Sequence, residues 1–331
     1  MSGDTILEVK NLVKHFPIMS RGVLLKKQIG VVHAVDGVSF SVKRGETFGL
    51  VGETGCGKTT TARAILALDP PTSGEIYFNG EEISRVFKSK DKAAILKLRR
   101  KMQYVFQNPY ASLDPRMTVS DIIMEPLLIH RHVPKEKWSD RLYELLRLVG
   151  LEEYHAERYP HEFSGGQRQR ICIARALAVE PELLIADEPV ASLDVSVRAQ
   201  ILNLLQELQQ KFKITYLYIS HDLSTVRHIC HRIAVMYLGK FVEIADTDDL
   251  FESPLHPYTQ ALMSSIPIPD PDAKTERIIL PGEVPSPINP PAGCRFQPRC
   301  VYAKERKCVE SVPKLVDVGN GHLVACEKAC S

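Results

Sequence analysis

Apolar and polar residues alternate along two segments near the start of the chain, residues 6–16 and 31–42. Alternation with a period of two is typical of strands that have one face buried and the other in solvent. Residues 74–83 continue the pattern and contain Asn79 and Gly80, a pair that favours a two-residue hairpin turn. This part of the chain is therefore predicted to form half-exposed strands and a hairpin.

Shorter apolar runs follow in the chain. Residues 46–52 form one run that ends in glycine, and residues 58–68 have the spacing of a helix. Residues 182–189 and 214–222 are compact apolar runs of the kind that become buried strands of a parallel sheet. The pattern predicts an α/β fold in which residues 91–160, charged and helical in pattern, form an inserted lobe.

The composition changes near residues 250–265, where a domain boundary is predicted. Proline-rich segments follow, together with five of the eight cysteines: Cys294, Cys300, Cys308, Cys326 and Cys330. The last part of the chain is therefore expected to be small and irregular in structure.

The charge balance excludes one class of partner. Lys and Arg number 42 against 40 Asp and Glu, which gives a net charge of +2; a dedicated nucleic-acid binder usually carries a clear basic excess.

No run approaches the ~18 apolar residues that span a bilayer. The first ten residues contain acidic side chains and no apolar stretch, so no secretory signal is expected. In a cytosolic chain, cysteines are more often thiols or metal ligands than disulfides.

Residues 52–59, GETGCGKT, fit the phosphate-loop pattern G-x-x-x-x-G-K-[ST] between a predicted strand and a predicted helix. Such a loop wraps phosphates with backbone N–H groups, while its lysine reaches the β- and γ-phosphates and its hydroxyl holds Mg²⁺. The residues predicted to bind the phosphates here are Gly52, Glu53, Thr54, Gly55, Cys56, Gly57, Lys58, Thr59 and Thr60, with Thr59 also on Mg²⁺.

An acidic pair and a histidine end the next two apolar runs. Asp187 is predicted to hold Mg²⁺, and Glu188 to polarise the attacking water as a general base. His221, at the end of the following run, is predicted to touch the γ-phosphate. The alternatives are an acidic pair that simply ends a strand and a histidine in an ordinary loop.

A helical pattern begins at Ser164-Gly165-Gly166-Gln167, although glycine costs about 1 kcal/mol relative to alanine in a helix. One interpretation is that Ser164 is an N-cap and that the two glycines after it relax a turn. Alternatively, an anion approaches bare backbone N–H groups at the start of the helix. The stretch alone leaves both interpretations open.

Five segments occur in a characteristic order: GETGCGKT, QNPYASLDP, FSGGQRQR, LLIADEPVASLD and SHD. Together they resemble the nucleotide-binding subunits of ATP-binding cassette (ABC) transporters. The resemblance implies a RecA-like P-loop core with an antiparallel β subdomain and a helical subdomain at about residues 107–180. It also implies a head-to-tail dimer with a homologous ATPase subunit and ATP between the two subunits.

The resemblance also implies roles for single residues. Ser164, Gly165, Gly166 and Gln167 would contact the γ-phosphate held by the partner subunit. Gln107 would sense Mg²⁺ and the γ-phosphate, Phe16 would stack on adenine, and Asp194 would cross the dimer interface.

The segment HPYTQALMSSIP and the cysteine-containing region after it resemble the oligopeptide/dipeptide/nickel branch of ABC importers. This resemblance implies a nucleotide-binding domain over residues 1–255 and a C-terminal extension over residues 256–331. It implies a peripheral subunit on the cytoplasmic face of the cell membrane that powers import of oligopeptides or dipeptides. Its partners would be two transmembrane permease subunits and an extracytoplasmic substrate-binding protein. Import of nickel or oligosaccharides is the alternative.

Four cysteines are spaced C-x5-C-x7-C-x17-C, from Cys294 through Cys300 and Cys308 to Cys326. Four thiolates suit a cubane iron–sulfur cluster, whereas the short pairs typical of zinc sites are absent. The resemblance favours a 4Fe-4S cluster at these positions, with Zn²⁺, free thiols or disulfides as alternatives.

Two other functional classes compete with the importer. Soluble ABC ATPases of DNA repair or translation interrupt the cassette with long coiled coils or duplicate it, and neither feature is found in the sequence. A redox enzyme built on the cysteines would need a cofactor fingerprint, but the only glycine-rich phosphate loop is the one at residues 52–59.

Overall fold

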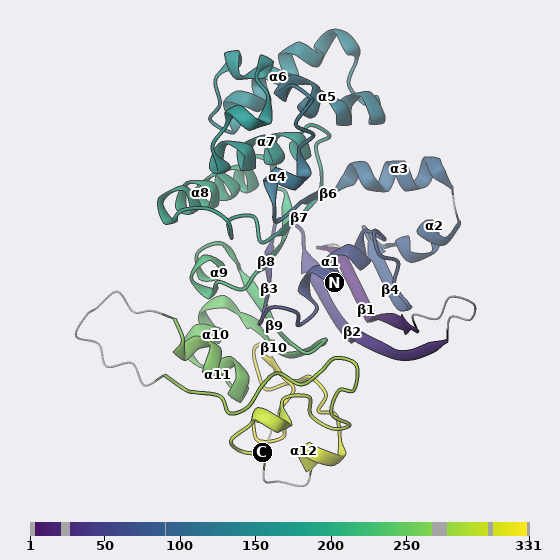
Figure 1. The fold of residues 1–331 in the computed structure, drawn as a ribbon, viewed down its shortest axis with the longest axis vertical. Helices are drawn as coiled ribbons and strands as arrows, with labels where there is room; N and C mark the ends of the chain where they lie inside the picture. Colours follow the sequence, from purple (N-terminus) through teal and green to yellow (C-terminus); the bar gives the residue numbers. More distant parts are fainter. Residues whose placement is uncertain (1–3, 21–26, 90, 267–276, 304–306, 330–331) are drawn as a thin grey trace, which may run out of the picture. The chain divides into compact units, whose positions relative to one another are not determined.

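The computed structural model describes residues 4–20, 27–89, 91–266, 277–303 and 307–329. The chain divides into two compact units that alternate along the sequence (Figure 1). The first unit consists of Met1–Ile6, Val42–Thr47 and Glu82–Ile219, and the second of Leu7–Ser41, Phe48–Glu81 and Ser220–Ser331.

Three parallel strands form the centre of the first unit. They are β6 (Met102–Val105), β7 (Leu183–Asp187) and β8 (Thr215–Ser220), and β7 pairs with both of the others. Every residue of β7 and β8 is buried. Strands covered on both faces need apolar side chains at consecutive positions, so the predicted buried parallel strands at residues 182–189 and 214–222 are confirmed.

Helices make up most of the rest of the first unit, and α7 (Gly165–Leu177) is central to their packing. It contacts α4 (Pro109–Ser112), α5 (Val119–His130), α6 (Trp138–Leu148) and α8 (Val195–Phe212). Its buried side chains include Ile171, Ile173 and Leu177. The remaining helical elements are α2 (Ile83–Ser89), α3 (Lys92–Lys101), η1 (Lys135–Lys137), η2 (Glu153–Glu157) and η3 (Pro160–Glu162).

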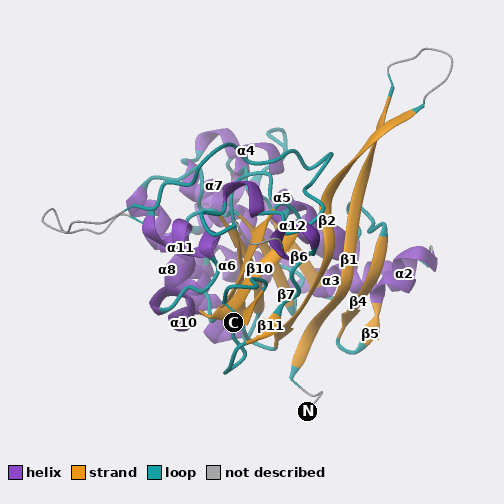
Figure 2. Cartoon of the chain, turned by 90° about the horizontal axis from the view of Figure 1, so that it is seen from below, coloured by secondary structure: helices purple, strands orange, loops and turns teal. Residues whose placement is uncertain are grey.

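The second unit contains a four-stranded sheet with two long strands, seen clearly in Figure 2. Its order is β2 (Gln28–Lys43), β1 (Thr5–Met19), β4 (Ser73–Phe78) and β5 (Glu81–Glu82), and β1 is antiparallel to β4. Asn79 and Gly80 connect β4 to β5 with φ angles of 51° and 79°. Both residues are left-handed, as a type I′ turn requires, and the predicted hairpin is confirmed.

A second group of strands in this unit leads to the phosphate loop. β3 (Thr47–Val51) runs parallel to β9 (Arg232–Tyr237), and β10 (Lys240–Asp246) is antiparallel to β9. β12 (Leu323–Val324) pairs with both β10 and β11 (Val316–Asp317). The helices of the unit are α1 (Lys58–Ile65), α9 (Leu223–Ile229), α10 (Thr247–Glu252), α11 (Pro257–Ser264), η4 (Gln297–Arg299) and α12 (Lys307–Glu310).

Aromatic rings hold the end of the chain against β9. Tyr237 of β9 lies 4.7 Å from Tyr258 and 5.3 Å from Phe296 between ring centroids, and all three side chains are fully buried or nearly so. Edge-on and tilted pairs at these separations are favourable beyond the area that they bury. The boundary at residues 255 and 256 and the subdomain limits remain predictions.

Candidate nucleotide-binding site

The phosphate loop connects β3 to α1 in the second unit. Gly52 and Gly57 have φ angles of 151° and 115°. A Cβ atom would lie 2.2 Å from the Met236 carbonyl oxygen at Gly52 and 2.2 Å from the Ala34 carbonyl oxygen at Gly57. Glycine is therefore required at both positions. Gly57 also gives α1 no side-chain cap, which suits the start of this helix to an anion.

Lys58 is the first residue of α1 and is only 5% exposed. Its Nζ donates hydrogen bonds to the carbonyl oxygens of Gly52 at 2.7 Å and Glu53 at 3.1 Å. These partners are neutral dipoles. A phosphate oxygen compensates a buried ammonium charge better than a carbonyl does, so the position of Lys58 fits the predicted contact with phosphates.

The other loop residues differ in exposure. Thr54, Gly55 and Thr59 are exposed, whereas Cys56 is buried and Thr60 is half-buried. Burial raises the pKa of the Cys56 thiol, which favours its uncharged form. The Cys56 carbonyl accepts a hydrogen bond from the Gly239 N–H at 2.8 Å. Cys56 therefore fixes the loop through its backbone and its packing.

The acidic pair lies at the carboxyl end of β7. Asp187 is 3% exposed and accepts a hydrogen bond from the Tyr104 hydroxyl at 2.7 Å. Glu188 has a φ of 45°, a conformation that costs energy for a residue with a side chain. Its N–H donates to the Ile219 carbonyl at 2.9 Å, and its carboxylate accepts from Gln107 Nε2 at 2.8 Å. The structure thus brings Gln107 to Glu188.

Packing within the chain explains only one of the two glycines at the start of α7. The Ser164 hydroxyl accepts from the Gln167 N–H at 3.3 Å, and Gln167 Oε1 accepts from the Ser164 N–H at 3.1 Å. This is a capping box. A Cβ on Gly166 would lie 2.3 Å from Val197 Cγ1, so packing against α8 requires that glycine. A Cβ on Gly165 would make only ordinary contacts at 3.4 Å or more. Packing within the chain does not explain Gly165.

Exposed apolar side chains lie near the start of α7. The Tyr110 hydroxyl is 3.6 Å from the point where a Gly165 Cβ would stand, and Tyr110 is 58% exposed. Asp194 is the N-cap residue of α8, is exposed, and makes no capping hydrogen bond. Val195, next to it, is 80% exposed. Apolar side chains left in solvent around a helix start are typical of an interaction surface.

Phe16 and His221 lie in the second unit. Phe16 is a half-exposed residue of β1, and Lys14 Nζ lies 4.7 Å from the centroid of its ring. His221 is exposed and directly follows β8. The second unit thus carries Phe16, the phosphate loop and His221, and the first unit carries Gln107, Ser164, Gly165, Gly166, Gln167, Asp187, Glu188 and Asp194.

Three residues that contact the predicted site were not predicted from the sequence. Tyr104 holds Asp187, as described above. The Tyr258 hydroxyl accepts a hydrogen bond from the Glu53 N–H at 2.9 Å, and Arg299 pairs with the Glu53 carboxylate at 3.0 Å. The segment HPYTQALMSSIP contains Tyr258 but indicates no role for it in the site, and no quoted motif contains Tyr104 or Arg299. The partners of these three residues lie 83, 205 and 246 positions away. Arg299 does stand out as a charged residue directly before Cys300 in the predicted cysteine site.

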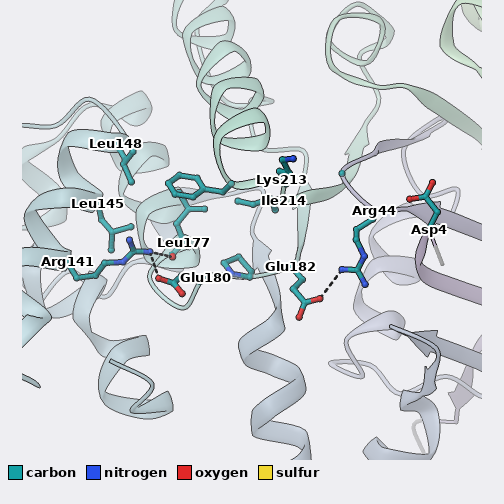
Figure 3. A pocket seen from close by; sticks show the side chains of 13 residues that line it. Asp4, Arg44, Arg141, Leu145, Leu148, Leu177, Glu180, Glu182, Lys213 and Ile214 are labelled. Carbon is teal, nitrogen blue, oxygen red and sulfur yellow. Dashed lines mark hydrogen bonds and ion pairs between the residues drawn. The ribbon is translucent and has the colours of Figure 1, made fainter. Parts of the chain in front are cut away.

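A cavity of about 640 Å³ lies in the first unit (Figure 3). Leu145, Leu148 and Leu177 form part of its apolar wall. Ion pairs lie on its edge, among them Arg44 with Glu182 at 3.2 Å. Glu182 precedes β7, whereas Asp187 ends it. Ligands of open α/β sheets bind at the carboxyl ends of the strands, whereas this cavity lies at the other end of β7 from Asp187 and Glu188.

Among the described residues, His15, His33 and Asp36 form a group whose potential ligand atoms lie within 4.8 Å of one another. His15 Nε2 is 3.2 Å from Asp36 Oδ1, but the other oxygen of Asp36 is paired with Arg295 and lies 3.7 Å from Lys240 Nζ. Burial alone would raise the pKa of Asp36, but Lys240 and Arg295 lower it below its ordinary value. A dication would meet two cations here, so the group is better explained as an ion-pair network.

Two family models match the chain. The model described as "ABC transporter" matches residues 35–191, and "Oligopeptide/dipeptide transporter, C-terminal region" matches residues 242–308. The chain is 52% identical to the oligopeptide transport ATP-binding protein AppF of Bacillus subtilis strain 168, over 98% of this chain and 97% of that protein. It is 50% identical to a probable peptide ABC transporter ATP-binding protein of Sinorhizobium fredii, over 98% and 90%.

The chain belongs to the ABC transporter family of ATPases. Its fold is similar to a dimeric post-hydrolysis structure of the ATP-binding cassette MJ0796 bound to ADP and Pi, with a TM-score of 0.63 and 30% identity over 73% of this chain and 99% of that one. CbiO1 from Clostridium perfringens, part of an ABC transporter complex, also has a TM-score of 0.63, with 29% identity over 76% and 92%. The predicted P-loop ABC ATPase fold is confirmed.

The iron–sulfur prediction is wrong. The relatives' names describe ATP-binding proteins and mention no such cofactor, and neither family description includes one. Burial, together with the neighbouring thiols of Cys308, Cys300 and Cys326, raises the pKa of Cys294 to about 11, and burial raises the pKa of Cys300 above its ordinary value. Among the described residues, Cys294, Cys300, Cys308 and Cys326 form no disulfide.

One further observation concerns the membrane. Within the described part of the chain, no helix is both long enough and apolar enough to span a bilayer.

Proposed function

We propose that this ABC ATPase powers the import of oligopeptides or dipeptides across the cytoplasmic membrane. The observation that carries the proposal is the pairing, in one chain, of an ABC ATPase region with a C-terminal region described for oligopeptide and dipeptide transporters. Relatives that match along nearly the whole chain carry names of oligopeptide and peptide transport ATP-binding proteins. ATP hydrolysis in this chain therefore drives peptide transport.

Each predicted site residue takes a role in ATP binding or hydrolysis. The phosphate loop binds the phosphates through Lys58 and its backbone, and Phe16 stacks on adenine. Thr59 and Asp187 offer oxygen ligands of the kind that Mg²⁺ prefers. Magnesium, when bound, neutralises charge on the phosphates.

Hydrolysis depends on Glu188 as the general base for the attacking water. The hydrogen bond from Gln107 to Glu188 at 2.8 Å supports a role for Gln107 in orienting that carboxylate. His221 contacts the γ-phosphate.

The signature residues Ser164, Gly165, Gly166 and Gln167 act on ATP held by a homologous subunit in a head-to-tail dimer, with Asp194 at the interface. Two observations support this arrangement: packing within the chain does not require Gly165, and Tyr110 and Val195 are exposed on the same unit. Such a subunit is peripheral on the cytoplasmic face of the membrane. There it pairs with two permease subunits, and an extracytoplasmic binding protein delivers the substrate.

Peptide uptake by cells tests the proposed function. Cells that lack this chain should lose most ATP-dependent uptake of a labelled tripeptide, because a permease without its ATPase cannot use ATP to complete a transport cycle. The wild-type chain should restore uptake, and the Glu188→Gln variant should not. Loss of nickel or oligosaccharide uptake with normal peptide uptake would reject peptide as the cargo. Unchanged uptake of all three would reject the importer function.

The two glycines of the signature give a test of the dimer arrangement. Gly166→Ala should destabilise the chain by about 1–3 kcal/mol, because its Cβ collides with Val197. Gly165→Ala should leave the unfolding temperature unchanged, yet it should lower ATP hydrolysis about 10- to 100-fold, because a methyl group then separates the backbone donors from the γ-phosphate. Circular dichroism melting and phosphate release measure both effects. Normal hydrolysis by Gly165→Ala would contradict the arrangement.

A further inference from the structure

Glu53, the second residue of the phosphate loop, has every polar group in a hydrogen bond. Its carbonyl accepts from Lys58 Nζ at 3.1 Å and from the Cys56 N–H at 3.2 Å. Its N–H donates to the Tyr258 hydroxyl at 2.9 Å, and its two carboxylate oxygens lie 3.0 and 3.3 Å from Arg299 Nη1. Glu53 therefore fixes the geometry of the loop at its start.

Two of these contacts come from the C-terminal region, residues 256–331. Tyr258 is the second residue of α11 and is 0% exposed, and Arg299 ends η4 and is 9% exposed. Phe296, one turn before Arg299, packs against Tyr258 at 5.5 Å between ring centroids. A buried side chain with packed neighbours has few alternative rotamers, so Tyr258 and Arg299 present fixed partners to Glu53.

A second arginine of the same short segment supports the other end of the loop. Arg295 donates hydrogen bonds to the Leu238 carbonyl and to Asp36. The next residue, Gly239, donates its N–H to the Cys56 carbonyl at 2.8 Å. Arg295 thus holds the turn between β9 and β10 on which Cys56 rests.

We infer that Tyr258 and Arg299 are positioning residues for nucleotide binding, through which the C-terminal region holds the phosphate loop in its binding shape. The inference rests on the proposed binding of ATP by this loop. Tyr258 and Arg299 act on ATP through Glu53, and Arg295 supports the loop from its other side. The ATPase region and the C-terminal region are therefore one functional unit for ATP affinity.

Substitutions at these contacts test the inference by ATP titration. Arg299→Gln should weaken ATP binding about tenfold, because the charge-assisted hydrogen bonds from Arg299 to the Glu53 carboxylate are lost. Tyr258→Phe keeps the ring and its packing, removes the acceptor of the Glu53 N–H, and should weaken binding about threefold to tenfold. In steady-state hydrolysis, KM for ATP should rise while kcat at saturating ATP changes less than twofold.

A double variant separates positioning from a merely structural role. If Arg299 acts through Glu53, Glu53→Gln combined with Arg299→Gln should bind ATP no more weakly than the weaker-binding single variant. Arg299→Lys should recover part of the affinity. Lys314→Gln removes an exposed charge from the same region and is the matched control, with wild-type affinity expected. A lower unfolding temperature with unchanged ATP affinity in both Arg299→Gln and Tyr258→Phe would overturn the inference.

Failure of the proposed function gives a different result. If the loop does not bind ATP, the wild-type chain shows no titration and Lys58→Ala is indistinguishable from it. If wild type binds, Lys58→Ala does not, and Arg299→Gln binds as wild type does, the ATP site stands and the positioning role is rejected.

Discussion

The Glu188→Gln variant should bind ATP with wild-type affinity and hydrolyse it about 10²- to 10⁴-fold more slowly, the usual contribution of a general base. Glutamine has nearly the shape of glutamate and can still hydrogen-bond to Gln107, so the loop after β7 should keep its geometry. It cannot accept a proton from water at neutral pH. ATP should therefore persist on the protein, and the ATP-bound dimer should accumulate.

Two measurements check this expectation: phosphate release gives the rate, and gel filtration with and without ATP gives the oligomeric state. Glu182→Gln is the matched control, since Glu182 lies at the opposite end of β7 and pairs with Arg44 and Lys101 at 3.2 and 2.8 Å. It should hydrolyse ATP normally. A Glu188→Gln chain that hydrolyses at the wild-type rate and stays monomeric in ATP would show that Glu188 is not the base.

The elements around the ATP motifs could be predicted because local sequence decides them. Strands buried on both faces require consecutive apolar residues, and β7 and β8 show this directly. The phosphate loop needs glycine where φ is positive and where the Met236 and Ala34 carbonyls come close. The hairpin could be predicted from Asn79 and Gly80 because its turn also needs residues that tolerate a positive φ. In each case the structure requires particular residue types at neighbouring positions, so the sequence shows a recognisable local pattern.

The contacts that complete the site could not be predicted, because they join residues far apart in the chain. Tyr104 reaches Asp187 across 83 positions, and Arg299 reaches Glu53 across 246. Each needs one side chain of the right kind at a place set by tertiary packing, and neither leaves a local pattern. The strained φ of Glu188 is likewise visible only in the structure.

The cysteines illustrate the opposite error. Four thiols at plausible spacing predicted a metal cluster, but spacing alone does not distinguish a ligand set from cysteines that share a small region, and the descriptions of the relatives and of the family name no such cofactor. The signature glycines show how the structure resolves an open alternative. Ser164 is an N-cap, and Gly166 is required by packing. Gly165 is required by neither.

Lys58→Ala should lose ATP affinity by at least about 100-fold, the loss expected when two charge-assisted hydrogen bonds to phosphate disappear. The substitution removes the only side-chain charge that the loop motif directs at phosphates, and it also removes the bonds from Nζ to Gly52 and Glu53. Titration with a fluorescent ATP analogue measures the affinity. Lys58→Met, which keeps most of the aliphatic stem in its buried position, should lose as much affinity as Lys58→Ala if the charge matters.

Ser164→Arg is the informative contrast to Lys58→Ala. Ser164 caps α7 on the first unit and is exposed, whereas Lys58 is buried in the phosphate loop. If the signature acts on ATP held by the partner, Ser164→Arg should bind ATP within about twofold of wild type, because its own phosphate loop is intact, but hydrolysis should be abolished, because the arginine side chain blocks the partner's site. Equal losses of ATP affinity in Lys58→Ala and Ser164→Arg would mean that both residues contact the same nucleotide within one subunit, and the two-subunit site would then be rejected.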